Sequence, residues 1–410
     1  MLNWVWVSFF IAAFFAAVGQ SIFLGNMEIW TSLVSEIFSS SKLAFEICLN
    51  LTGILCFWLG LMKVAEESGV MRVLAKVLHP LFKKVMPEVP ENSPAIGSIV
   101  MNMAANMLGL DNAATPMGIK AMEQLQEVNP NKEVASNAQI LFMVINSSAV
   151  TIVPITILMY RAQMGSVNPS AVFIPILLAT SISTFVGFLS VAFVQKINIF
   201  NKVVLAYILA FIGIIGGVAY GFFQLEPSSR AQVSTEIGNF IIFFIIIGFI
   251  SCAIYKKVKV YDVFVEGAKE GFSTAVRIIP YLVAMLVAIA VLRASGILDY
   301  FVLGLGKLFA FLGMNTDFVP ALPTAILKPF SGSGARAMMI ETMNNYGVDS
   351  FPAFVSSVIQ GSTETTFYVL AVYFGAVKIT KIRHALPCAL FADFVGVILA
   401  IYFGYLFYQA

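Results

Sequence analysis

The segment IQGSTETTFYVL, residues 359–370, interrupts an apolar chain with a glycine and five consecutive polar side chains, one of them the carboxylate of Glu364. Of the 410 residues, 59% are hydrophobic and only 11% are charged, whereas a soluble domain carries about 25% charged residues. A carboxylate inside a bilayer is costly and is by default a functional-site hypothesis. The segment therefore predicts a broken helix with a functional polar group. A structural ion pair of Glu364 with Arg336 or Lys328 is the alternative.

Apolar runs of about twenty residues predict helices that cross a lipid bilayer. They cover residues 4–24, 43–64, 171–195, 203–224, 233–254, 275–293 and 385–408. The first run lacks a basic leader and a small-residue cleavage site, so we expect a retained helix rather than a signal peptide. The predicted fold class is an all-α polytopic membrane protein.

Two regions between these runs, residues 64–170 and 294–382, have shorter apolar stretches. Pro, Gly, Asn and Ser break them, as in PAIGSIVMNMAANMLGL (94–110), AATPMGIKAMEQL (113–125) and ILFMVINSSAVTIVPITILMY (140–160). Such segments are tolerated at membrane depth only where they are buried in protein or line a polar cavity. We therefore expect broken or re-entrant helices in both regions.

The two broken regions are copies of each other. The matching pairs are LMKVAEESGVMRVLAKVLHPLF (61–82) with AIAVLRASGILDYFVLGLGKLF (288–309), GIKAME (118–123) with GARAMM (334–339), and INSSAVT (145–151) with IQGSTET (359–365). Matches in a shared order predict a duplication. The predicted units are a first repeat with an N-terminal helix over residues 1–198, a linking transmembrane helical hairpin over 199–257, and a second repeat over 258–410.

Basic residues predict how the repeats are oriented. Three loops carry them, at residues 196–202, 256–259 and 378–383. If all three loops are cytoplasmic, the helices that close the two repeats, 171–195 and 385–408, run in opposite directions. The sequence thus predicts inverted-topology repeats, an architecture that holds substrate at the repeat interface in secondary transporters. Two tandem domains that point the same way are the alternative.

Polar residues at the helix breaks are the candidates for a substrate site. The stretch PFSGSGARA (329–337) predicts an unwound turn leading into a helix, whose N–H groups would face an anionic or strongly polar group. Gly361 is expected to kink the chain in the same way. The candidates in the second repeat are Gln360, Gly361, Ser362, Thr363, Glu364, Ser331 and Ser333, and those in the first repeat are Asn112, Asn146, Ser147 and Ser148. For the Asn and Ser residues, a role as helix–helix contacts is the alternative.

Other polar residues carry further expectations. Glu364 and Arg336 are candidates for coupling an ion. Glu46, Asn50 and Asp393, within predicted spans, either line a cavity or pair with a neighbouring repeat. The 37 Phe and 18 Met residues are expected to face lipid or to pack.

Several function classes are not expected. The sequence has no nucleotide-binding loop, metal-ligand spacing or nucleophile–base pair, so neither enzyme activity nor a cofactor nor a metal is expected. The net charge of +2 does not suggest a nucleic-acid partner. The four scattered cysteines are expected to be thiols in the core or facing lipid.

At these motifs the chain resembles two known families. FWLGLMKVAEESGVM (57–71), NAATPMGIKAMEQL (112–125) and NSSAVTIVPITI (146–157) resemble the spore maturation protein A family. VEGAKEGFSTAVRIIPYLVAMLVAIAVLRASG (265–296), KPFSGSGARAMM (328–339) and QGSTETTFYVLAVYFG (360–375) resemble the spore maturation protein B family. The chain thus looks like a fusion of the two. Both belong to the nucleoside-recognition or Gate superfamily, which includes segments of concentrative nucleoside transporters and of the ferrous-iron permease.

The resemblance implies a pair of gates in a multi-pass protein of the bacterial cytoplasmic (inner) membrane. In the nucleoside transporters a Gly-Gln-Thr-Glu turn contacts the nucleobase, and QGSTET is similar to it at Gly361, Thr363 and Glu364. Here Gln360 precedes the glycine, and Ser362 stands where that family has its glutamine. The opposing hairpin's contacts correspond loosely to residues 146–148. Related transporters are oligomers, so a homo-oligomer, a dimer or trimer, is expected.

Two functions remain open from the sequence. The first is a secondary transporter that moves a small polar solute, nucleoside-like, amino-acid-like or other, by alternating access. It would be facilitative or coupled to H+ or Na+, with Glu364 binding the solute or carrying the proton. The second is a non-transporting membrane scaffold for spore or envelope maturation, which needs no accessible polar cavity.

Overall fold

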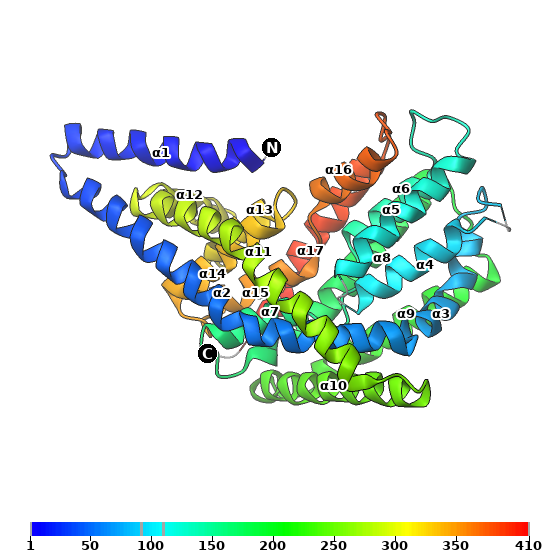
Figure 1. Ribbon diagram of the computed structural model, residues 1–410. Coiled ribbons are helices and arrows are strands. Elements are labelled where there is room, and N and C mark those ends of the chain that lie inside the picture. The colour runs from blue at the N-terminus through cyan, green and yellow to red at the C-terminus, as the bar shows by residue number, and fades with distance from the viewer. Residues whose placement is uncertain (1, 91–92, 109–110, 409–410) are drawn as a thin grey trace.

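A computed structural model describes residues 2–90, 93–108 and 111–408, and within them the chain forms helices and no β-strand (Figure 1). Among the described residues, seven helices are long and apolar enough to cross a membrane: α1 (Leu2–Phe23), α2 (Glu28–Ser68), α8 (Phe173–Gln195), α9 (Lys202–Gln224), α10 (Pro227–Tyr255), α11 (Val260–Ala294) and α17 (Ala385–Phe407). Each predicted span coincides with one of these helices or with part of one, apart from one or two residues at an end, so the prediction of an all-α polytopic membrane protein is confirmed. The predicted spans 43–64 and 275–293 are only parts of α2 and α11, which have 41 and 35 residues.

The shorter helices follow in corresponding order in the two halves. The first half has α3 (Val70–Val85), α4 (Ala95–Met107), α5 (Asp111–Val128), α6 (Asn137–Ser147) and α7 (Ile155–Gln163) before α8. The second has α12 (Ile297–Phe311), α13 (Leu322–Leu327), α14 (Gly332–Tyr346), α15 (Phe351–Ser362) and α16 (Thr366–Ala376) before α17. This common order fits the predicted duplication. The opposite orientation of the repeats and the boundaries of the three units stay predictions.

The aligned Ser-Gly pairs form the same turn in both halves. Gly69 joins α2 to α3 and Gly296 joins α11 to α12, with φ angles of +77° and +80°. Glycine adopts this left-handed conformation at little cost. The stretch 113–125, in contrast, was expected to be interrupted but lies inside the continuous helix α5, which accommodates Pro116.

The two halves are joined where α2 and α11 cross, as Figure 1 shows. Glycines make this crossing close. A Cβ added at Gly271 would lie 2.5 Å from the Cα of Cys56, and one added at Gly267 would lie 2.6 Å from the carbonyl oxygen of Leu59. Glycines four residues apart let membrane helices approach at backbone distance. Side chains at these positions would therefore force α2 and α11 apart.

The halves also interlock through their later helices. α8 packs against α17, α6 against α17, and α15 against α8. The N–H groups of Thr380 and Lys381 donate to the carbonyl oxygen of Glu133, and the N–H of Ala135 donates to that of Lys381. These contacts bring the two sets of broken helices together at the centre of the molecule.

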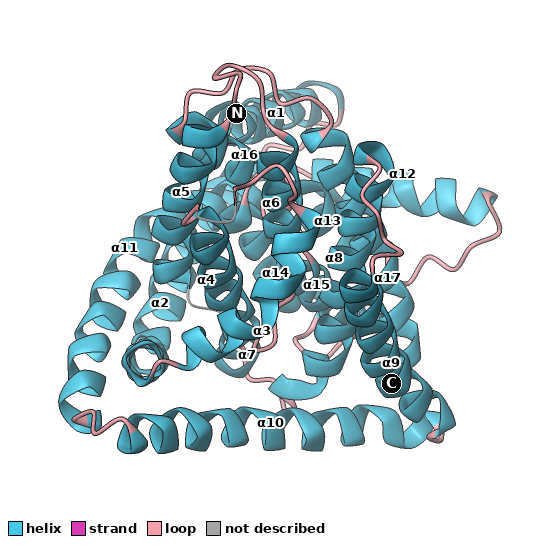
Figure 2. Cartoon of the chain, turned by 90° about the vertical axis from the view of Figure 1, so that its right-hand side faces the viewer, coloured by secondary structure: helices cyan, strands magenta, loops and turns pink. Residues whose placement is uncertain are grey.

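The remaining long helices lie at the periphery. α10 runs along one edge of the molecule and α1 lies at the opposite edge (Figure 1, Figure 2). Large apolar side chains on them are exposed, including Phe14, Phe15, Phe240 and Phe243. Such surfaces suit lipid contact in a chain whose helices span a bilayer.

Candidate functional site

The two aligned helix breaks touch each other. α6 ends at Ser147 and α15 ends at Ser362, and Thr363 is extended, with φ −147° and ψ 171°. The backbone N–H of Glu364 donates to the carbonyl oxygen of Ser147, with an N···O distance of 2.9 Å. The copies INSSAVT and IQGSTET, far apart in sequence, therefore meet at their helix ends.

Gly361 does not kink the chain as expected, because α15 stays helical through Ser362. A Cβ at Gly361 would lie 2.8 Å from the side chains of Ile157 and Ile176. The glycine thus lets α15 approach α7 and α8 closely. The break itself lies at residues 363–365, where β-branched threonines on both sides of Glu364 favour extended backbone.

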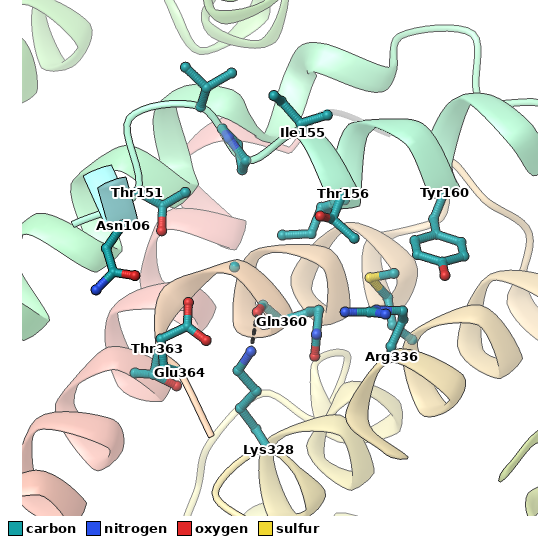
Figure 3. Close-up of a pocket in the computed structure, with 15 residues that line it drawn as sticks. Asn106, Thr151, Ile155, Thr156, Tyr160, Lys328, Arg336, Gln360, Thr363 and Glu364 are labelled. Carbon is teal, nitrogen blue, oxygen red and sulfur yellow. Dashed lines mark hydrogen bonds between the residues drawn. The ribbon is translucent and has the colours of Figure 1, made fainter. Parts of the chain in front are cut away.

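A cavity of about 820 Å³ lies between the two broken-helix regions. Besides three tyrosines, its polar lining residues are Asn106, Thr115 and Asn146 from the first half and Lys328, Ser331, Ser333, Arg336, Gln360, Glu364 and Thr365 from the second. A smaller cavity of about 100 Å³ shares Asn106, Lys328, Arg336, Gln360 and Glu364 with it and adds Thr151, Thr156, Gly361 and Thr363. Figure 3 shows the first half on one side of this smaller cavity and the second half on the other.

Lys328 and Gln360 bring buried polar groups to both cavities. Lys328 Nζ, next to the end of α13, donates to the carbonyl oxygen of Gln360 at 2.8 Å (Figure 3). Only 7% of Gln360 is exposed, and its Oε1 atom has no hydrogen-bond partner among the described residues. Buried polar atoms are normally satisfied by protein or water. This amide oxygen is therefore an acceptor open to a bound molecule.

The start of α14 also faces the larger cavity. Ser331 caps the helix, and its Oγ accepts a hydrogen bond from the N–H of Gly334 at 3.0 Å. The first N–H groups of a helix have no intrahelical partner and carry a partial positive charge. Because Ser331, Gly332 and Ser333 line the cavity, this end of α14 favours an oxygen atom or an anion there. The predicted turn leading into a helix is thus confirmed.

Buried amides from the first half form the opposite wall. Asn106 Nδ2 donates to Asn146 Oδ1 at 2.7 Å, which links α4 to α6. Tyr373 of α16 lies against the same amides: its hydroxyl donates to Asn146 Oδ1 at 3.4 Å and accepts from Asn102 Nδ2 at 3.3 Å. Asn146 therefore lines the cavity and connects helices at the same time.

Other predicted residues do not line either cavity. Ser147, Ser148 and Ser362 are buried, and their hydroxyls donate to carbonyl oxygens of their own helices. Glu46 and Asn50 are exposed on α2. Asn112 belongs to α5, but its side chain lies outside the part of the chain that the structure describes. No group of three or more His, Cys, Asp or Glu residues able to hold a metal ion occurs among the described residues.

Aromatic residues are a part of the cavity wall that sequence reasoning missed. Phe330 and Phe367 stack with their ring centroids 4.9 Å apart, and both line the larger cavity. Arg336 lies over the ring of Tyr160, with its Cζ atom 5.6 Å from the centroid. The Phe residues were expected to face lipid or to pack. Phe330 and Phe367 could have been singled out, because both belong to the predicted polar motifs.

The fold and the cavity together define a multi-pass helical membrane protein, in which two facing sets of broken helices surround a cavity lined by polar residues. The family model described as nucleoside recognition (Gate) matches residues 48–166 and 275–380. These segments make up more than half of the chain and include both helix breaks. The chain therefore belongs to the Gate family.

Two relatives each match part of the chain. Spore maturation protein A of Bacillus subtilis (strain 168) is 38% identical over 183 residues, which are 45% of this chain and 90% of that protein. Spore maturation protein B of the same organism is 48% identical over 157 residues, 38% of this chain and 86% of that protein. Similarity to both supports the prediction of a fusion of the two families. No solved structure matches the chain.

Proposed function

We propose that this protein is a secondary transporter of the bacterial cytoplasmic membrane that moves a small polar solute by alternating access. The observation that carries the proposal is the cavity of about 820 Å³ between the two helix breaks. Sites for small molecules typically measure about 300–1,000 Å³. The cavity is open, and the carboxylate of Glu364 is exposed in it, while Lys328 is buried beside it. Charged side chains at this depth would be costly to keep in a protein whose only need was a packed core.

The lining chemistry supports a solute with both hydrogen-bond donors and acceptors. The start of α14 and the guanidinium of Arg336 offer positive charge to an acceptor or an anionic group. Gln360 Oε1 and the carboxylate of Glu364 offer acceptors to donor groups, and the stacked pair Phe330–Phe367 offers an apolar face. The solute would lie between these groups and the asparagine wall.

The contact between the breaks supports a gate. Beyond α15 the chain is extended, and the N–H of Glu364 is held by the carbonyl oxygen of Ser147. Discontinuous helices at a repeat interface carry the substrate and ion sites of many secondary transporters. In alternating access this contact would open on one side of the membrane as the cavity closes on the other.

The competing function is a scaffold for spore or envelope maturation; the two relatives are named for spore maturation. A scaffold would keep the repeats and their crossing but would bind no solute in the cavity. The two functions differ in one property, the binding of a small molecule that depends on the lining side chains.

The experiment that separates them is a thermal-shift screen of purified protein with nucleosides, amino acids, dipeptides and divalent cations. A solute that raises the unfolding temperature is then tested on Glu364→Gln and on the matched control Glu46→Gln, whose carboxylate is exposed on α2. We expect the shift to persist in the control and to vanish in Glu364→Gln, with unchanged protein yield. An undiminished shift in Glu364→Gln, or no shift and no uptake with any solute class, contradicts the proposal.

A further inference from the structure

Asp393 is a buried carboxylate that does not line the solute cavities. It lies inside α17 and is only 4% exposed. Its Oδ2 atom accepts a hydrogen bond from Thr366 Oγ1 at 2.6 Å, while its Oδ1 atom has no hydrogen-bond partner among the described residues. An ionised carboxylate at such a place is costly unless a proton or another cation neutralises it.

Residues in the helix break and directly after it lie beside Asp393 and its face of α17. Thr366 begins α16. Thr363 packs over Gly396, since a Cβ on that glycine would lie 2.7 Å from Thr363 Cγ2. Gly396 is three residues after Asp393 and so shares its face of α17. Glu364 therefore lines both cavities, Thr363 lines the smaller cavity and also packs its methyl group on α17, and Thr366, next to the break, bonds to α17.

Thr363 adds a second unsatisfied group at the break. It is 4% exposed, and its Oγ1 atom has no hydrogen-bond partner among the described residues. Two buried oxygen atoms, one on the break and one on α17, are thus left without partners. Native proteins rarely leave such atoms unsatisfied without a functional reason or a bound species.

The charges that act on Asp393 belong to the solute site. α17 packs against α6, α8, α10, α15 and α16. α6, α8, α15 and α16 carry no Asp, Glu, Lys, Arg or His, and on α10 the charged residues Arg230 and Glu236 lie near its first turns. Lys328 and Glu364, which line both cavities, are the charged groups that influence Asp393. Because such couplings are reciprocal, a solute that changes the surroundings of these two residues also changes how readily Asp393 binds a proton.

We propose that Asp393 carries the proton that drives transport, an inference that rests on the transport function proposed above. In each cycle a proton from water on one side forms an O–H bond at the free Oδ1 atom and neutralises the carboxylate. The same bond breaks when the site faces the other side, and the proton returns to water. A proton needs only this one free oxygen, whereas a metal cation needs a shell of several oxygen ligands.

The first test follows the proton itself. Asp393→Asn keeps an oxygen that can accept from Thr366, so the contact between α16 and α17 is retained. Infrared difference spectra of the protein in lipid, taken from acid to alkaline pH, should show a carboxyl band that titrates in wild type and in the control Asp262→Asn, an exposed position on α11. The band should be missing in Asp393→Asn. An identical titration in Asp393→Asn overturns the proposal.

The second test measures coupling in vesicles loaded with the pH indicator pyranine. Addition of nucleosides, amino acids or dipeptides outside should acidify the lumen for wild type and Asp262→Asn, but not for Asp393→Asn, which should still exchange labelled solute across the membrane. Solute uptake by wild type that follows a sodium gradient and ignores pH overturns the proton assignment. If Asp393→Asn acidifies the lumen as wild type does, the role of Asp393 in coupling is contradicted and the transport function is not. No uptake by wild type contradicts the transport function and the coupling role with it.

Discussion

Arg161 joins the two halves of the protein through a buried cluster of hydrogen bonds. It lies near the end of α7 and is only 1% exposed. Its guanidinium donates to Asp349 Oδ1 at 2.9 Å and to the carbonyl oxygen of Val348 at 3.2 Å, both just before α15, and to Ser166 Oγ at 3.1 Å. Its Cζ atom also lies 5.9 Å from the ring centroid of Phe354. We predict that Arg161→Met destabilises the protein by about 3 kcal/mol.

The magnitude follows from what the substitution leaves behind. Breaking a buried ion pair by removing one partner costs about 3–5 kcal/mol, because the other charge stays uncompensated. The lower end of this range applies, because the side chain of Asp349 is 39% exposed. Its Oδ2 atom also still accepts a hydrogen bond from the backbone N–H of Val167, with an N···O distance of 2.9 Å. The matched control is Lys42→Met. Lys42 Nζ lies 3.7 Å from Glu46 Oε1, and the two side chains are 77% and 51% exposed. Lys42→Met should therefore change the free energy of unfolding by no more than about 0.5 kcal/mol.

The assay is reversible unfolding by sodium dodecyl sulfate in mixed micelles, followed by circular dichroism. We expect the free energy of unfolding to fall for Arg161→Met and to stay near the wild-type value for Lys42→Met. If Arg161→Met also unfolds within about 0.5 kcal/mol of wild type, the buried bridge between α7 and the start of α15 does not hold the halves together, and the reasoning fails.

Three further changes probe other parts of the molecule. Gly271→Ala adds a Cβ 2.5 Å from a backbone atom of α2 and should lower the free energy of unfolding by about 1–3 kcal/mol in the same titration. The control Gly216→Ala, where a Cβ meets open space, should be nearly neutral. Equal effects of the two changes would argue against a close crossing of α2 and α11. Tyr373→Phe removes the hydroxyl bonded to two buried asparagine amides and should cost about 1 kcal/mol, so a stabilised variant would count against that network. Burial and a neighbouring arginine lower the pKa of His384. Stability should therefore fall as the pH drops through and below the ordinary histidine range, because the unfolded chain then binds a proton that the folded protein does not. The dependence of stability on pH should be weaker in His384→Gln. An unchanged dependence would contradict the lowered pKa of His384.

The spans and the breaks that follow α6 and α15 could be predicted from the sequence, because both depend on local composition, whereas the interruption expected at residues 113–125 was wrong. A run of about twenty apolar residues is long enough to cross a bilayer, and consecutive polar residues interrupt it. Which side chains of a break face the cavity could not be predicted. Gly361 and Ser362 stay helical while Glu364 does not, and the carbonyl of Ser147, from the other half, holds the chain there.

Hydrogen bonds between side chains of distant helices could not be predicted from the sequence either. Arg161 lies in an apolar segment, and its partner Asp349 is 188 residues away. Asp393 was recognised as a polar residue inside a span, but its partner Thr366 belongs to the motif assigned to the solute site. Such contacts depend on how α7, α16 and α17 pack, and hydropathy carries no information about them.

The most direct measurement of the central claim is the water accessibility of the cavity between the breaks. Two single-cysteine variants are made in a protein whose four native cysteines are replaced by alanine. Ser333→Cys places a thiol at a position that lines the cavity. Ala337→Cys places one a turn further along α14, at a fully buried position. Membrane-impermeant maleimide is added to one side of the membrane at a time. The account predicts labelling of Ser333→Cys from at least one side, protection by the bound solute, and no labelling of Ala337→Cys. A Ser333→Cys protein that reacts only after denaturation would contradict it.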